Sequence, residues 1–209
     1  MGFFSRLFRG AGPSREDWGV ISLRIAKGLE EVRKKWFETL VGIFREMSKK
    51  GAWKDPPITV KRTNLAGDAT HALKAYQLYL VSAFLAKHGY IPPSQGRDFA
   101  DLLFAQVCGT ELEQCLAFFN RYHEAHEDPG RQLFRFASDI SRYITGNDTS
   151  FYESMLVDPT IPVFAWLTHM VVADAFGDQV TVAQLQTKLS EFRAKLSAGT
   201  YPFSGGSST

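Results

Sequence analysis

The side chains best suited to metal or acid–base chemistry lie in the segment from Tyr122 to Asp128. His123 and Glu127 are four positions apart, and His123 and His126 are three apart, so each pair would share a helix face and could bind one metal ion. A site needs at least one further ligand, and the sequence does not say which distant polar residue supplies it: His71, His88 or Asp139. The competing interpretation is a solvated helix end, where His is favoured by the helix dipole.

A second candidate is His169, which lies inside the apolar segment 161–176 with Asp174 five positions further on. Such a His could act as a base, but a buried imidazole bound to a neighbouring group is the more ordinary interpretation. Phosphate-binding glycine loops, Gly-x-Ser-x-Gly and His-Glu-x-x-His are absent from the sequence. Cys108 and Cys115 fit small buried thiols. We therefore expect no cofactor and no catalytic residue, and keep His123, His126 and Glu127 as candidate metal ligands.

The N-terminal segment carries a different kind of chemistry. Its apolar residues fall on one face of a short helix and its two arginines lie off that face, which is typical of an interfacial anchor. The candidate contact residues for a membrane or a partner are Phe3, Phe4, Arg6, Leu7, Phe8 and Arg9. Three interpretations remain open: contact with a membrane surface, packing onto the body of the same chain, and docking on a partner protein.

The distribution of charge supports an anionic partner for the front of the chain. The whole sequence has a net charge of +2, but residues 1–62 carry a net +7 and residues 63–209 a net −5. Such asymmetry predicts either an anionic partner or contact between the two parts. Nucleic acid is a less favoured partner than an anionic membrane, because acidic residues interrupt the basic residues of the long first helix: Glu30, Glu31, Glu38 and Glu46.

These candidates must be positioned by helices. Apolar residues recur every three or four positions from Trp18 to Met47, which predicts one long amphipathic helix that begins after Ser14 and ends at Lys49-Lys50-Gly51. Its spacing also leaves open pairing of two copies through this helix. Further helices are expected over residues 65–87, 94–107, 110–126, 133–144, 150–156, 160–176 and 181–196. Thr110 and Thr181 each precede a Glu or Gln by three positions and predict capping boxes.

The sequence therefore predicts an all-α fold, a compact bundle of about seven to eight helices with the apolar segment 161–176 at its centre. We expect an N-terminal amphipathic segment over residues 1–13, a single helical-bundle domain over 14–198 and a flexible tail over 199–209. No segment resembles a secretory signal or a membrane-spanning helix, which predicts a cytoplasmic protein, with membrane association left open.

The function that fits these features is a non-enzymatic helical adaptor with a protein partner, held at a membrane surface by its aromatic and basic N-terminus. One alternative is an all-α enzyme or metal-binding protein that uses the His/Glu cluster in a pocket. The other alternative is a nucleic-acid-binding protein that uses the basic N-terminal half.

Overall fold

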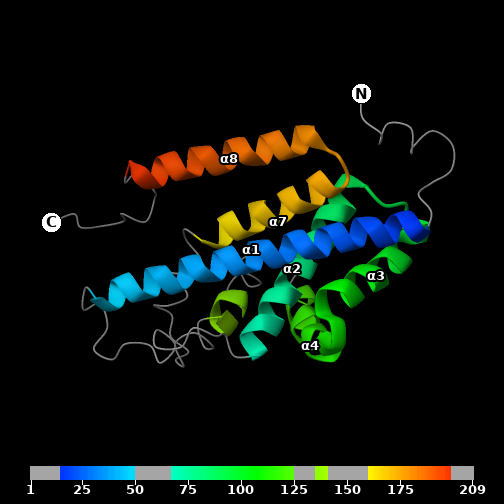
Figure 1. Ribbon diagram of the computed structural model, residues 1–209, viewed down its shortest axis with the longest axis horizontal. Coiled ribbons are helices and arrows are strands. Elements are labelled where there is room, and N and C mark those ends of the chain that lie inside the picture. The colour runs from blue at the N-terminus through cyan, green and yellow to red at the C-terminus, as the bar shows by residue number, and fades with distance from the viewer. Residues whose placement is uncertain (1–14, 50–66, 125–134, 141–159, 199–209) are drawn as a thin grey trace.

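The computed structural model of the protein describes residues 15–49, 67–124, 135–140 and 160–198, and these residues are helical apart from short turns (Figure 1). They form six labelled α-helices, fewer than the seven to eight expected, together with a short helical segment at 135–140. The expected helix at 150–156 lies outside the described residues. The α-helices are α1 (Arg15–Lys49), α2 (Gly67–His88), α3 (Gly96–Cys108), α4 (Leu112–His123), α7 (Ile161–Ala175) and α8 (Gln179–Ser197).

The long first helix is confirmed. α1 extends over 35 residues, with the bounds that its apolar periodicity predicted. Along its described part the stripe is buried in the chain's own core, since Ile25, Leu29 and Trp36 are each at most 4% exposed. The stripe is therefore occupied by contacts with α3 and α7.

The apolar helix α7 lies between α1 and α8 in the bundle, as Figure 1 shows, and also packs against α2. This confirms its predicted central place. It contacts α1 at Gly28, where an added Cβ atom would lie 2.5 Å from Val171 Cγ1. The two helices can therefore pack at this distance only because residue 28 has no side chain.

The buried residues form two clusters that α1 joins. The first surrounds Tyr76 of α2, whose ring stacks on Phe136 with centroids 3.8 Å apart, and includes Trp36 of α1. The second surrounds Trp18 and Phe99 and draws on α1, α2, α3, α4 and α7. Because α1 and α7 contribute to both clusters, the two halves of the core are tied together.

Both predicted capping boxes are wrong. The residue before α4 is Glu111 rather than Thr110, and no side chain caps that helix. Glu111 instead accepts a hydrogen bond from Lys74 of α2. At α8, Asp178 occupies the capping position, and its carboxylate accepts hydrogen bonds from the Thr181 amide at 2.9 Å and the Thr181 hydroxyl at 2.7 Å. A carboxylate at this position also benefits from the positive end of the helix dipole, which a threonine hydroxyl does not.

Candidate functional site

The candidate contact residues Phe3, Phe4, Arg6, Leu7, Phe8 and Arg9 lie outside the described residues. So do His126 and Glu127 of the candidate metal site. The third candidate ligand, His123, is the last residue of α4, exposed, and its ring stacks on Phe119 with centroids 6.0 Å apart. Among the described residues, no three His, Cys, Asp or Glu side chains are grouped so that they could hold a metal ion.

The distant residues that could have completed a polar site do not meet. His71 lies 3.6 Å from Glu111 at the α2–α4 contact. Asp139 is buried elsewhere and forms an ion pair with Arg121 at 3.0 Å. The His169 ring stacks on Phe84 and the His88 ring lies tilted against the same Phe84, and neither shares a site with His71 or Asp139. These described groups therefore pair separately and do not form a common catalytic pocket.

Asp139 has a structural environment. Its carboxylate is 1% exposed and accepts a hydrogen bond from the Tyr122 hydroxyl at 2.9 Å. The Arg121 guanidinium neutralises the buried charge from the surface side. Nearby, Arg135 donates a hydrogen bond to the Arg121 carbonyl at 2.7 Å. These contacts anchor the helical segment 135–140 to α4.

His169 lacks the carboxylate that a general base of the His–Asp type requires. Its ring stacks on Phe84 with centroids 4.5 Å apart. Asp174 is exposed and accepts a hydrogen bond from Gln179. Burial lowers the pKa of His169 to about 4, although a hydrogen bond with the Leu80 carbonyl opposes this shift. The imidazole is consequently neutral at neutral pH and acts as a packed aromatic group.

Cys108 and Cys115 are both free and buried, as expected. Their side chains are joined by a hydrogen bond, which raises the pKa of Cys108 together with burial and lowers the pKa of Cys115. Two cations lie near these thiols. Lys74 pairs with Glu111, and the largely buried Arg33 donates to Gln77 Oε1 at 2.6 Å. Burial lowers the pKa of Arg33.

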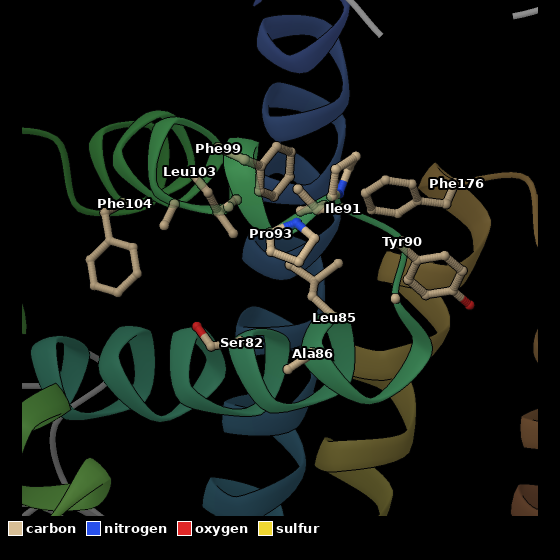
Figure 2. A pocket seen from close by; sticks show the side chains of 14 residues that line it. Ser82, Leu85, Ala86, Tyr90, Ile91, Pro93, Phe99, Leu103, Phe104 and Phe176 are labelled. Carbon is tan, nitrogen blue, oxygen red and sulfur yellow. The ribbon is translucent and has the colours of Figure 1, made fainter. Parts of the chain in front are cut away.

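A cavity of about 910 Å³ lies between the C-terminal half of α2, the turn that follows it and α3 (Figure 2). Its size is within the range of ligand-binding pockets. Phe99 and Leu103 of α3 are buried in its wall, whereas Ala86, Pro92 and Pro93 are exposed and stand where it meets solvent. Figure 2 shows Leu85 of α2 directed across it toward Pro93.

The described residues that line this cavity carry no charge, and the hydroxyl groups among them are already bonded. Ser82 donates to the Leu78 carbonyl at 2.8 Å. Tyr90 donates to Asp178 Oδ2 at 2.7 Å, and its pKa is raised to about 12 by burial and by this bond. A mostly apolar lining with no charged side chain suits an apolar occupant, and the described lining residues offer no charged acid or base for catalysis.

No pattern in the sequence points to this cavity. Tyr90-Ile91-Pro92-Pro93 was recognisable as a rigid turn, since two prolines restrict the backbone. The sequence does not show that Trp18, 72 positions before this turn, also supports it. Trp18 Nε1 donates a hydrogen bond to Gln95 Oε1 at 2.8 Å. This contact joins distant segments of the chain beside the cavity.

None of the described helices combines the length and the apolar character that crossing a bilayer requires. Along the described part of α1 the exposed charged residues are mixed, with Arg24, Lys27, Lys34 and Lys35 opposed by Glu30, Glu31 and Glu38. The chain was also compared with protein-family models, with curated proteins and with solved structures, and nothing matched in any of the three.

Proposed function

We propose that the protein is a non-enzymatic helical interaction protein, held at an anionic membrane surface by residues 3–9 while its helical bundle binds a protein partner. The observation that supports the membrane part is the position of its exposed apolar side chains. Among the described residues, the large hydrophobic side chains that stand out in solvent are Val20, Leu23 and Val180, which are 60%, 41% and 71% exposed.

These three residues lie toward the N-terminal ends of two helices: Val20 and Leu23 are in the second and third turns of α1, and Val180 is in the first turn of α8. Figure 1 shows that both helix starts are at the same end of the molecule. Five residues separate the aromatic segment 3–9 from the start of α1. We expect its Phe and Leu side chains to add to the apolar residues at this end of the molecule. Arg6, Arg9 and the exposed Arg24 supply the positive charge that is typical of an interfacial contact.

The non-enzymatic part of the proposal is supported by the separate pairing of the described titratable groups. His71, Asp139 and His169 each have their own partners in different parts of the core. The mixed charges on α1 also favour a membrane over nucleic acid, because a phosphate backbone requires an uninterrupted basic surface. A cytoplasmic location and pairing of two copies through α1 stay predictions.

Vesicle co-flotation of the full chain tests the proposal. We expect the chain to float with phosphatidylcholine vesicles that contain phosphatidylserine, and more weakly with phosphatidylcholine alone. The double variant Phe4→Ser/Phe8→Ser should remain with unbound protein on both. The variant Arg6→Gln/Arg9→Gln should lose only the preference for anionic lipid, roughly thirtyfold in affinity for two charges at about 1 kcal/mol each.

The control is Lys188→Gln/Lys195→Gln, which removes two positive charges from the exposed face of α8 outside its first turn. It should float as the unchanged chain does. If the unchanged chain floats on neither lipid, or if Phe4→Ser/Phe8→Ser floats equally well, the membrane role is wrong.

A further inference from the structure

We infer that the cavity between α2 and α3 is the docking site for this chain's own residues 3–8. The inference goes beyond the proposed function, because it assigns an occupant to the cavity whether or not the protein meets a membrane. It begins from the chemistry of the cavity wall. The side chains that line it carry no charge, most of its surface is apolar, and its two side-chain hydroxyl groups are already bonded within the protein, so the cavity favours an apolar occupant.

The second step is the position of α1 relative to this cavity. The Trp18 ring lies 5.3 Å from the Phe99 ring and 6.2 Å from the Phe176 ring, and both of those rings line the cavity. Trp18 also holds the turn at Gln95 by its indole hydrogen bond. The chain therefore enters the described structure beside the cavity, and the segment that precedes α1 starts from its edge.

The chain between residues 3–8 and α1 is long enough for these residues to reach the cavity. Seven positions separate Phe8 from Arg15, the first residue of α1, and they can span up to about 25 Å when extended. The connecting sequence Gly10-Ala11-Gly12-Pro13 disfavours a continuous helix and permits a reversal of chain direction. Residues 3–8 can therefore return to the cavity beside Trp18 without displacing α1.

The fourth step is the match between occupant and site. Phe3, Phe4, Leu7 and Phe8 would present one apolar face, and an aromatic side chain buries about 150–250 Å² when it packs. Arg6 lies off that face and would remain in solvent at the open side, where Ala86, Pro92 and Pro93 are exposed. Because the same face would contact a membrane, docking and membrane contact are mutually exclusive, and the cavity withholds the anchor from lipid.

Limited proteolysis of the full chain without lipid tests the docking. Trypsin cuts after Arg6 and Arg9, and mass spectrometry follows both cuts. The variant Ala86→Trp places a large ring at the mouth of the cavity, at a residue that is exposed and so tolerates the substitution. Ala83→Trp is the matched control, since Ala83 is exposed on the same helix but is not part of the lining.

We expect cleavage after Arg6 and Arg9 to be about tenfold faster in Ala86→Trp than in the unchanged chain, which corresponds to about 1.4 kcal/mol of docking. Ala83→Trp should be cut at the unchanged rate. Equal rates in all three proteins overturn the inference. Protection that increases with protein concentration identifies a second copy as the occupant and also overturns it.

A crosslinking measurement does not depend on cavity variants. A benzoylphenylalanine at position 4 should crosslink within the chain to residues 82–104 or to Phe176 on irradiation, whereas the same group at the exposed position 180 should not. Crosslinks from position 4 that avoid both residues 82–104 and Phe176 overturn the inference. Both measurements exclude lipid, so failure of the docking and failure of the membrane role are distinguished: the first appears here, the second in the vesicle experiment.

Discussion

At the scale of single residues, the polar groups of the core are paired in ways that serve packing. Asp139 is bonded to Tyr122 and Arg121, and Asp178 caps α8 while accepting the Tyr90 hydroxyl. A buried carboxylate without such partners would be strongly destabilising. His169 differs from these carboxylates because it carries no charge that needs a partner. Its imidazole stays neutral when it is buried.

The lowered pKa of His169 predicts a particular pH dependence of stability. Above pH 6.5 the imidazole is neutral in both the folded and the unfolded chain. Between pH 6.5 and pH 4 the unfolded chain takes up a proton that the folded chain does not, so the free energy of unfolding falls as the pH falls. Lowering the pKa from 6.5 to about 4 corresponds to about 3 kcal/mol.

Urea unfolding at several pH values between 7.5 and 4 measures this contribution. In His169→Gln the part of the fall in the free energy of unfolding that comes from His169 should be missing. The difference in the free energy of unfolding between the unchanged chain and the variant should therefore narrow as the pH falls. His123→Gln is the matched control, because it makes the same substitution at an exposed histidine. If His169→Gln reproduces the full pH dependence of the unchanged chain, His169 is not the group responsible.

At the scale of helices, the contact between α1 and α7 depends on one residue without a side chain. Gly28 faces Val171, a β-branched residue whose side chain has little freedom to move away. Gly19 is on the same helix, and an added Cβ atom there would meet nothing within 4 Å. The two glycines therefore have opposite structural roles in one helix.

This contrast predicts opposite effects of the same substitution. Gly28→Ala should lower the free energy of unfolding by about 1–3 kcal/mol, because the added methyl group forces α1 and α7 apart. Gly19→Ala should raise it by about 0.5–1 kcal/mol, because alanine favours the helix. Chemical denaturation measures both. The double variant Gly28→Ala/Val171→Ala should recover part of the loss, and equal effects of the two single variants would contradict the assigned contact.

At the scale of the whole molecule, α1 and α7 carry residues of both core clusters. Trp36 and Phe164 belong to the first cluster, and Trp18 and Val172 belong to the second. A helix that is continuous through both clusters would expose its own apolar residues if only one cluster came apart. The described helices should therefore unfold together, which is the behaviour expected of the single domain predicted for residues 14–198.

Thermal unfolding of two matched variants tests this cooperativity. Phe99→Leu weakens the second cluster and Phe136→Leu the first, and both phenylalanines are fully buried. Each should lower the midpoint of one common transition, by about 2–4 °C for each kcal/mol lost. A thermogram with two transitions, of which each variant shifts only one, would show that the clusters unfold separately.

The sequence by itself determined the helical class, the length and buried face of α1 and the central place of α7, because these follow from local periodicity and apolar content. It misplaced the caps of α4 and α8. Thr110 and Glu113 have the spacing of a capping box, but α4 begins after Glu111 and no side chain caps it. The Glu111 carboxylate is bonded to Lys74 of α2. At α8 the neighbouring Asp178 provides the stronger acceptor.

The tertiary structure alone decided which polar groups meet and where a cavity forms. His71, His88 and Asp139 were equivalent candidates for a further metal ligand along the chain, yet their positions in the bundle separate them. Trp18, Tyr90, Phe99 and Phe176 are far apart in sequence and come together at one cavity. The physical reason is that helix periodicity specifies which face of a helix is buried, whereas the partner of that face is set by packing between distant segments.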